Sequence, residues 1–569
     1  MASESLKSSD ADVREHSNRS SPQQGREGTP YAAGAAAGAR AANAFFPLGY
    51  REGFSQWWAR LPAAAAEHKV LSYLPYLGPQ APTHLQTGNT SEFPNGNPPS
   101  SLQSADHKQQ GEISADSRND PYGPRRWSSS MVELSGKDRA LNEFSVERVG
   151  EEVDQHLVML HGYGAGLGFF YKNFEPLSRL KGWQLHALDM LGMGRSTRPP
   201  FKIKAKDREE AIREAEAWFV DALEEWRIKR KIDRFTLLGH SLGGYMAVAY
   251  ALKYPGHLNK LILASPVGIP EDPYAVTADV AEPSDSTLPN ELTQDQREIT
   301  ASAATPGTAP KTSDGSFITG RNPEAQAANQ PPRRNMPKWF AYLWEANVSP
   351  FSLVRWTGPF GPRLVSGWTS RRFSHLPAEE AKALHDYSYS IFSQRGSGEY
   401  ALAYILAPGA FARSPLIRRI HGVGRQMIES GNAPPNLTET ATSYSIFSKK
   451  AAPQEPTSEG ASASPVLASN APSIPPNPRR ENGLPIVFMY GDHDWMDVTG
   501  GHAAVARLEE EQRRVLADAS PEERQKEQGS ARVVVINRAG HHLYLDGWED
   551  FNRVILSEME DVNKRERAA

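Results

Sequence analysis

The chain has 569 residues, a net charge of −4 and no cysteine. The lack of cysteine excludes disulfides, thiolate metal sites, a thiol nucleophile and cysteine lipidation. The 63 Lys and Arg nearly balance the 67 Asp and Glu, which argues against a nucleic-acid binder held by a chain-wide basic field. No run of 18 apolar residues occurs, so we expect no transmembrane helix.

The first 127 residues divide into three segments of different composition. Residues 1–44 and 80–127 are polar and are predicted to be disordered, because they bury too little apolar area to offset the entropy of ordering. Residues 45–79 form an aromatic amphipathic segment between them. Its apolar residues recur at spacings of three and four, which would place them on one helical face. The residues on that face are Tyr50, Phe54, Trp57 and Leu61.

Residues 128–274 contain short apolar runs, typical of buried strands, that alternate with helical patterns. The clearest helical pattern spans 207–227. Strands that alternate with helices are typical of a parallel sheet wound by right-handed crossovers. The strand runs are 157–160, 185–188, 235–238 and 261–264.

The second half of the chain interrupts this pattern and then resumes it. Residues 275–335 and 432–482 are low-complexity inserts that are predicted to be disordered. Between them, residues 336–431 are helical and aromatic and would form a lid, and residues 483–569 return to strands and helices. We therefore predict one α/β domain, with a mostly parallel sheet, helices on both faces and an inserted helical lid. The resumed strand runs are 486–490 and 533–536.

A Gly-x-Ser-x-Gly motif follows the third strand run directly. It reads Gly239-His240-Ser241-Leu242-Gly243 and precedes a helical run that stops before Pro255. This is the setting of a nucleophile elbow, in which small residues let the backbone turn sharply and the serine is presented at the carboxyl edge of the sheet. The motif predicts Ser241 as a nucleophile.

A serine hydroxyl needs a base within hydrogen-bond reach, and the base needs an acid that orients it. On this scaffold the expected chain order is serine, acid, histidine. The loop after the last strand run carries Gly540-His541-His542. We predict His541 as the base because it follows Gly540 at the loop apex, and His542 is the alternative.

The acid is expected after the strand run 486–490, in Gly491-Asp492-His493-Asp494. We predict Asp494, three residues past the turn glycine, and Asp497 is the alternative acid. Asp492 is assigned to the turn. The same segment can be interpreted as a metal site, but two carboxylates without further ligands at defined spacing are weak support for one. We expect neither a metal nor a cofactor.

Acyl transfer passes through an oxyanion that needs fixed donors. The N–H of Leu242, directly after the nucleophile, is one predicted donor. The other is the N–H of Tyr163, in the glycine-rich loop His161-Gly162-Tyr163-Gly164-Ala165-Gly166 that follows the first strand run. That loop lacks the Lys-Ser/Thr of a P-loop and the spacing of a dinucleotide fingerprint.

With these residues, the chain resembles the α/β-hydrolase superfamily, and more closely its branch of cardiolipin-specific deacylases and lysophosphatidic-acid acyltransferases. The resemblance covers about 128–275 and 336–565. The aromatic segment that begins at Phe45 is similar to the N-terminal stretch of fungal members. The motifs that carry the resemblance are HGYGAG from His161, DMLGMGRS from Asp189, GHSLGG from Gly239, YGDHDWMD from Tyr490 and GHHLYLD from Gly540.

The resemblance implies a serine lipid hydrolase or acyltransferase that acts on phospholipid acyl esters through an acyl-enzyme on Ser241. The reaction would be cardiolipin deacylation, lysophosphatidic-acid acylation or both. Some relatives lack the nucleophile and act as co-activators, but Ser241 is present here. Two alternatives remain: a soluble ester hydrolase of another substrate class, and a non-enzymatic adaptor at a membrane or lipid droplet.

His541 to Asp546 form an H-x4-D arrangement similar to the signature associated with glycerolipid acyl transfer. Asp546 would either brace the loop of the base or cap the following helix. The expected partners are a phospholipid substrate and, through the aromatic segment 45–79, the surface of a membrane. The resemblance implies an intracellular, membrane-associated location, with the mitochondrion first and the cytoplasm or lipid droplet as alternatives.

Overall fold

The computed structural model describes five stretches of the chain, which belong to one unit within residues 47–569: these are 47–77, 120–271, 346–407, 411–428 and 479–568. The segments predicted to be disordered at 1–44 and 275–335 lie outside these stretches, as do most of 80–127 and of 432–482. The first ten residues of the predicted lid also lie outside them.

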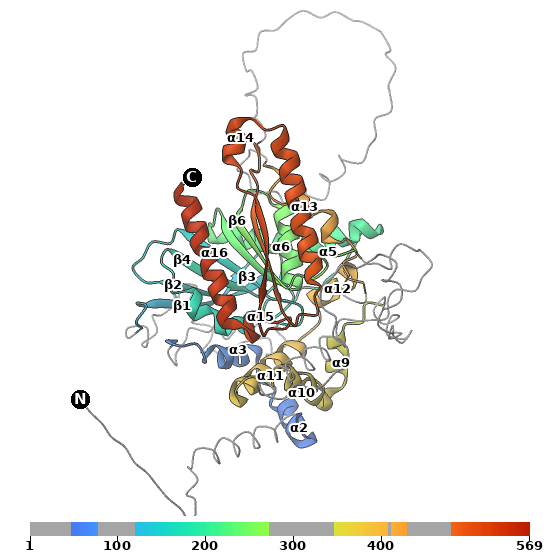
Figure 1. Cartoon of the computed structure of the whole chain (residues 1–569). Coiled ribbons are helices and arrows are strands. Elements are labelled where there is room, and N and C mark those ends of the chain that lie inside the picture. The colour runs from blue at the N-terminus through green and yellow to red at the C-terminus, as the bar shows by residue number, and fades with distance from the viewer. Residues whose placement is uncertain (1–46, 78–119, 272–345, 408–410, 429–478, 569) are drawn as a thin grey trace, which may run out of the picture. The chain divides into compact units, whose positions relative to one another are not determined.

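An eight-stranded sheet forms the centre of the unit, in the order β1-β2-β4-β3-β5-β6-β9-β10 (Figure 1). The pairings of β2 with β1 and with β4 are antiparallel, and all other pairings in this sheet are parallel. A mostly parallel sheet agrees with the prediction. The strands are β1 (Arg125–Glu133), β2 (Ala140–Arg148), β3 (Gln155–Leu160), β4 (Trp183–Leu188), β5 (Phe235–His240), β6 (Leu258–Ala264), β9 (Pro485–Gly491) and β10 (Ser530–Ile536).

The boundaries of the folded core differ from the prediction at two places. The core was expected from residue 128, but β1 begins at Arg125 and the side chains of Asp120 and Arg125 are already buried. Residues 479–480, expected inside the second insert, form β8 (Arg479–Arg480), which pairs with β7 (Met427–Ile428). The start of β1 and the whole of β8 consist of arginines, so neither sequence has the apolar run that is typical of a buried strand.

Side chains on the parallel strands alternate between two buried clusters, as the two-residue period of a strand requires. On β5, Phe235 and Leu237 join one cluster and Leu238 joins the other. Helices therefore cover both faces, because each apolar side needs a partner. The first cluster includes residues of α5 (Arg208–Arg230), α6 (Leu242–Lys253) and α13 (Val498–Ala517), and the second includes residues of α4 (Tyr171–Leu177), α15 (Leu543–Asp546) and α16 (Trp548–Ala568).

Helix α5 illustrates why the core helices begin where they do. Its N-cap, Asp207, accepts a hydrogen bond from the N–H of Glu210 at 2.9 Å. Acidic residues occupy the first turn and basic residues the last turn, which suits the helix dipole. The observed helix extends three residues beyond the predicted C-terminal end at residue 227.

Short helices between β6 and β9 form the lid. They are α9 (Pro350–Trp356), η5 (Gly358–Phe360), α10 (Gly361–Arg372), α11 (Ala378–Phe392), η6 (Gly398–Ala401), α12 (Leu402–Ile405), η7 (Leu416–Arg418) and η8 (Ile420–Gly422). The remaining elements are η3 (Leu167–Phe170) and α14 (Pro521–Lys526). In the part of the chain that is described, no helix is both long and apolar enough to cross a bilayer.

The aromatic N-terminal segment forms two helices that meet the lid (Figure 1). Helix α2 (Tyr50–Ala59) contacts η5 and α10, and α3 (Ala63–Leu71) packs against α11 and η3. The prediction that Leu61 belongs to this helical face is wrong, because α2 stops at Ala59 and Arg60 adopts a left-handed conformation. The chain then turns into α3 at Pro62.

Candidate active site

Ser241 lies at a sharp turn between β5 and α6. Its backbone has φ 53° and ψ −115°, a sparsely populated conformation for a residue with a side chain. The turn is held by hydrogen bonds from Ser241 N to Ala264 O at 2.9 Å and from Val267 N to Ser241 O at 3.3 Å. A Cβ on Gly243 would lie 2.6 Å from Leu160 O, so this position has room only for glycine.

The predicted acid and base lie side by side at the carboxyl ends of β9 and β10. His541 Nδ1 is 3.2 Å from Asp494 Oδ1, and both side chains are 1% exposed. Because a carboxylate accepts, Nδ1 carries the proton and Nε2 is left as the acceptor. Asp494 is itself held by the N–H of Met496 at 3.0 Å and by the hydroxyl of Ser265, which follows β6.

The alternative residues occupy other positions. Asp497 caps α13, where it accepts from the N–H and the hydroxyl of Thr499 and is exposed. Asp492 accepts from the N–H of Ala539 at 3.0 Å and so ties the acid loop to the base loop, which agrees with a turn role. His542 is buried against the ring of His240, with their centroids 5.2 Å apart.

His240, the second residue of the elbow motif, links the elbow to the loop of His541. Its Nε2 donates to the carbonyl of His541 at 2.9 Å, which fixes its tautomer. Burial lowers the pKa of His240 well below its ordinary value, so the ring is neutral. This bond places the residue before Ser241 directly against the backbone of the predicted base.

The glycine-rich loop after β3 is oriented by His161. Met190 N donates to His161 Nε2 at 3.1 Å, so Nδ1 carries the proton and donates to Gly162 O at 2.7 Å. Burial lowers the pKa of His161 to about 4, which keeps the ring neutral. In a trans peptide the C=O and the following N–H point in opposite directions. The bond at Gly162 O therefore directs the N–H of Tyr163 away from His161.

Gly162 also lies close to the elbow. A Cβ there would be 2.8 Å from His240 Nδ1 and 3.1 Å from Ser241 Cβ. The loop that carries the Tyr163 N–H thus passes directly beside Ser241. The N–H of Leu242, the first residue of α6, lies at the N-terminus of a helix, where donors are oriented for an anion.

Residues 155–351 match the family described as "alpha/beta hydrolase fold". Together with the sheet order and the elbow, this match decides the architecture. The chain has an α/β-hydrolase fold. The match includes Ser241 and ends before the loops of Asp494 and His541.

Curated relatives of this hydrolase-fold protein act on lipids according to their names. The chain is 34% identical over 308 residues to "1-acylglycerol-3-phosphate O-acyltransferase" of Arabidopsis thaliana, which covers 52% of this chain and 58% of that protein. It is 32% identical over 269 residues to "1-acylglycerol-3-phosphate O-acyltransferase ABHD5" of Homo sapiens, over 46% and 58% of the two chains. The human "(Lyso)-N-acylphosphatidylethanolamine lipase" is 31% identical over 268 residues, 47% and 60% of the two chains.

The chain thus spans 58–60% of the length of these relatives. Among solved structures, an esterase from Exiguobacterium antarcticum aligns with 76% of this chain and 99% of its own, at 14% identity and a TM-score of 0.38. The chain is an α/β-hydrolase-fold protein related, at about one third identity over half its length, to ABHD5-like 1-acylglycerol-3-phosphate O-acyltransferases.

The lid places stacked aromatic rings against the glycine-rich loop beside Ser241. Phe351 of α9 stacks on Tyr163 with centroids 5.1 Å apart and on Phe392 of α11 at 4.3 Å. Trp368 of α10 contacts Phe392 and Phe373. Ser241 is only 7% exposed and His541 1% exposed, so water has little access to the site.

Asp546, the last residue of the H-x4-D arrangement, does not cap α16 through its side chain. One carboxylate oxygen accepts from the N–H of Gly540, the residue before His541, at 3.3 Å. The other lies 3.3 Å from Arg372 Nη1 at the end of lid helix α10 and 3.3 Å from His375 Nε2. Asp546 therefore braces the loop of the base and ties it to the lid.

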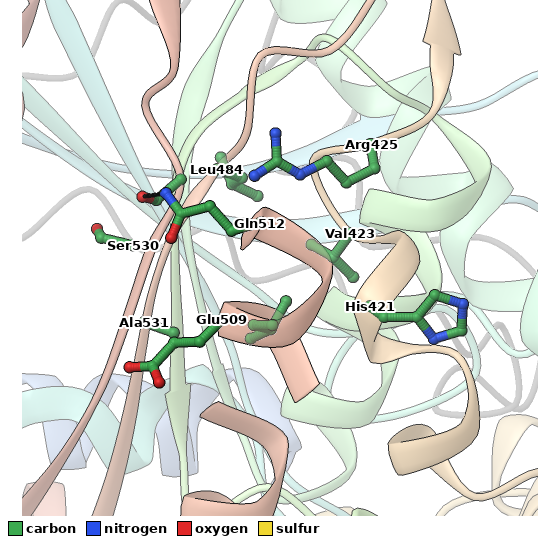
Figure 2. A pocket seen from close by; sticks show the side chains of 10 residues that line it. His421, Val423, Arg425, Leu484, Glu509, Gln512, Ser530 and Ala531 are labelled. Atoms are coloured by element: carbon green, nitrogen blue, oxygen red, sulfur yellow. Dashed lines mark hydrogen bonds between the residues drawn. The ribbon is translucent and has the colours of Figure 1, made fainter. Parts of the chain in front are cut away.

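One pocket lies outside this edge. A pocket lined by His421, Arg425 and Gln512 includes Leu484 before β9 and Ser530 at the start of β10 (Figure 2). It lies at the amino ends of these strands, away from the residues that follow their carboxyl ends. Across the described stretches, no group of three or more His, Cys, Asp and Glu is arranged to hold a metal ion.

Sequence reasoning missed one buried acid, Glu67 of α3, because the whole segment 45–79 was interpreted as a membrane anchor. Glu67 is fully buried and lies on the apolar face of its helix, three or four residues from Ala63, Ala64, Val70 and Leu71. An acid on the apolar face of an alanine-rich helix was the available signal, because such a group is buried only with a partner.

Proposed function

We propose that the protein moves acyl groups from a glycerolipid ester through a covalent intermediate on Ser241. The acyl group then passes to the hydroxyl of 1-acylglycerol-3-phosphate or to water. The observation that carries this proposal is the Asp494–His541 contact of 3.2 Å beside a strained nucleophile elbow. No cofactor takes part in this chemistry.

In the first step, Ser241 Oγ attacks the carbonyl carbon of the lipid ester and His541 Nε2 takes its proton. Asp494 holds the Nδ1–H of the ring and stabilises the imidazolium that forms. The oxyanion receives hydrogen bonds from the N–H groups of Tyr163 and Leu242. The bond between carbonyl carbon and leaving oxygen then breaks, and His541 gives its proton to the departing alcohol.

In the second step, His541 takes a proton from the incoming hydroxyl, whose oxygen attacks the acyl-enzyme, and Ser241 is released with the proton. Water and a lipid alcohol compete at this stage. The aromatic stack of Tyr163, Phe351 and Phe392 limits water at the site, which favours a bound alcohol over hydrolysis. This argument and the names of the curated relatives both favour acyl transfer.

Cardiolipin deacylation, which the sequence resemblance implies, would use the same first step with water as the acceptor. The competing reactions can be compared with purified protein and defined lipids. We expect wild-type protein to acylate 1-acylglycerol-3-phosphate faster than it deacylates cardiolipin, with both rates abolished in S241A. Cardiolipin deacylation without transfer would make the protein a deacylase. Equal rates in wild type and S241A would reject Ser241-dependent chemistry on these lipids and leave the ester hydrolase of another substrate class and the adaptor as alternatives.

We also propose a peripheral membrane contact, through a surface formed by α2 and the outer side of the lid. We call it the apolar lid surface. The ring of Tyr50 meets that of Phe360 with centroids 6.2 Å apart, and the guanidinium of Arg363 lies 3.9 Å from the centre of the Tyr50 ring, so α2 and the lid are continuous here. The members of the surface, each exposed, are Tyr50, Phe54, Trp58, Leu353, Trp356, Phe360 and Leu364.

Chemistry supports a bilayer as the partner of the apolar lid surface. Trp and Tyr prefer membrane interfaces, and exposed Arg51, Arg60 and Arg371 add positive charge near it. Each such side chain that moves from water and is fully buried in the bilayer contributes roughly 1.5–3 kcal/mol to the free energy of membrane binding. Helix α3 does not take part, since it is packed into the fold. The mitochondrial location implied by the resemblance stays a prediction that fractionation of cells tests.

A further inference from the structure

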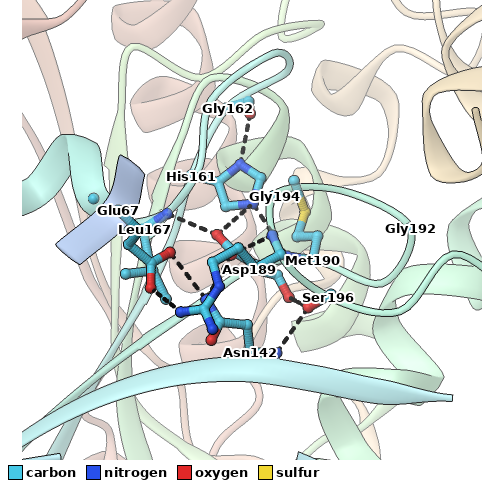
Figure 3. A network of polar contacts seen from close by, with 12 residues as sticks. Glu67, Asn142, His161, Gly162, Leu167, Asp189, Met190, Gly192, Gly194 and Ser196 are labelled. Carbon is cyan, nitrogen blue, oxygen red and sulfur yellow. Dashed lines mark hydrogen bonds and ion pairs between the residues drawn. The ribbon is translucent and has the colours of Figure 1, made fainter. Parts of the chain in front are cut away.

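A buried polar network joins the N-terminal helix α3 to the hydrolase core (Figure 3). Glu67 Oε1 pairs with Arg195 Nη1 at 2.5 Å, and its Oε2 accepts from Asn142 Nδ2 and from Tyr387 OH, each at 3.1 Å. These partners come from the loop after β4, from β2 and from α11. All four side chains are fully buried, so the contacts form away from water.

The same network holds Asp189, which also lies in the loop after β4. Asn142 Nδ2 donates to Asp189 Oδ2 at 2.8 Å as well as to Glu67, and the N–H of Arg195 donates to the same Asp189 oxygen at 2.8 Å. Two carboxylates thus share Asn142 and Arg195. Burying a charged group costs free energy unless the group is paired. Because Asn142 and Arg195 contact both carboxylates, a change at Glu67 alters the contacts that hold Asp189.

Asp189 contacts the glycine-rich loop that carries Tyr163. Its Oδ1 accepts from the N–H of Leu167 at 2.7 Å, just after the loop, and lies 3.6 Å from His161 Nε2. A Cβ on Gly166 would meet Tyr387 OH and Asp189 Oδ1, so the loop packs directly on the network. The loop 161–167 is therefore fixed at its end by Asp189 and at its start by His161.

We propose that Glu67 is a positioning residue for the oxyanion loop 161–167. It orients Asn142 and Arg195, which hold Asp189 against Leu167. It also orients Tyr387, whose hydroxyl accepts from the N–H of Gly168 just after the loop. This inference rests on the proposed serine chemistry at Ser241. It makes α3 part of the catalytic apparatus, although the helix precedes the hydrolase core in the chain. Burial raises the pKa of Glu67 to about 7, as expected for a carboxylate in this environment.

Hydrolysis of p-nitrophenyl butyrate by the full-length protein tests the inference. The variants are E67Q, which keeps the size of the side chain but cannot neutralise Arg195, and E67A, which removes all three contacts. The matched control is K69A on the same helix. Lys69 pairs with Asp386 at 2.9 Å, with side chains 38% and 9% exposed. Lys382 and Gln56 also contact Asp386, so its carboxylate keeps partners in K69A and we expect little loss of stability.

We expect kcat to fall by about tenfold in E67Q and by about 100-fold in E67A, with KM within about twofold of wild type, because a misplaced oxyanion donor acts on the transition state. K69A should match wild type. If E67Q and E67A fold and keep the kcat of K69A, the inference is wrong. If S241A hydrolyses the ester as fast as wild type, the proposed function is overturned instead.

A double variant separates positioning from a purely structural role. E67L/R195M replaces the ion pair by apolar side chains, which commonly preserves stability. We expect it to recover the melting temperature lost in E67A while kcat stays at least about tenfold below wild type. Recovery of both quantities together would mean that Glu67 only balances a buried charge, and the positioning role would be rejected. This variant carries the test if E67A does not fold.

Discussion

Arg372, at the end of lid helix α10, lies 3.3 Å from Asp546, the aspartate of the H-x4-D arrangement, and both side chains are nearly inaccessible to water. The same carboxylate holds the N–H of Gly540, next to His541. The motif aspartate thus connects the lid to the loop of the predicted base. This geometry gives it a supporting role in either acyl transfer or hydrolysis.

Replacement of Asp546 tests that role. D546A should destabilise the protein by about 3–5 kcal/mol, since it removes one partner of a buried ion pair, and should lower hydrolysis and acyl transfer in parallel. Urea unfolding and the two activities are measured on the same preparations. R372A should give a similar loss, with a coupling free energy of about 0.5–3 kcal/mol in the double-mutant cycle. Selective loss of transfer, with hydrolysis intact, would contradict the supporting role.

The choice between the two candidate acids makes a second prediction. D494N should lower kcat by about 10³–10⁴-fold with the fold intact, because the amide no longer orients and stabilises the His541 ring. D497N should be mild, since asparagine also serves as an N-cap for α13. Both are compared with wild type in kcat for a soluble ester and in melting temperature. The opposite ranking would make Asp497 the acid.

Truncations at the N-terminus separate membrane contact from folding. A deletion of residues 1–80 would remove α3, whose buried residues include Val70, Leu71 and Glu67, and should yield unfolded or inactive protein. Among the described elements, a deletion that ends at Leu61 removes α2 alone, and it should leave a folded protein with weaker binding to anionic vesicles. Flotation assays and circular dichroism report the two outcomes.

Point variants provide the matched comparison for that truncation. F54S/W58S changes two exposed rings of the apolar lid surface, and R513S changes an exposed residue of α13. Vesicle affinity should fall by about tenfold or more in the first, as expected from the loss of two interfacial rings, and should stay unchanged in the second. Equal binding by all three proteins would exclude the apolar lid surface as the contact.

Stability should fall as the pH is lowered from about 6.5 to 4. Burial lowers the pKa of both His161 and His385 to about 4. In this window the unfolded chain binds protons that the folded protein cannot, so unfolding is favoured as the pH falls. Glu67 acts in the opposite direction, because burial raises its pKa from 4.5 to about 7. Between these values the folded protein binds a proton that the unfolded chain does not, so this group stabilises the fold as the pH falls.

The effect of the histidines exceeds that of Glu67, because His240 and His542 are also buried with pKa values well below the ordinary range. The free energy of unfolding, measured in urea at pH 7.5, 6.0 and 5.0, should therefore decrease with acidification by more than about 2 kcal/mol. In H385Q the dependence on pH should be shallower. A stability that rises towards pH 5 would contradict this account of the buried rings.

Local sequence predicted the elbow well, because its glycines, strand and helix are contiguous in the chain and each serves the same turn. Asp494 and His541 were also placed by their position after apolar strands. Strands β1 and β2 were missed, since they lie at the antiparallel edge and include polar residues such as Ser128, Ser130 and Asn142, so no apolar run marks them. The contacts of Glu67 with Arg195 and of Arg372 with Asp546 join residues more than 100 positions apart in the sequence, which no local pattern encodes.

The proposed acyl-enzyme requires a nucleophilic Ser241, which a fluorophosphonate probe followed by peptide mapping with mass spectrometry detects. Wild-type protein should carry a single adduct on the peptide that contains Ser241, labelling should be absent in S241A, and H541A should label at least about 100-fold more slowly because the hydroxyl has lost its base. Equal labelling of wild type and S241A, or an adduct on another residue, would contradict the account.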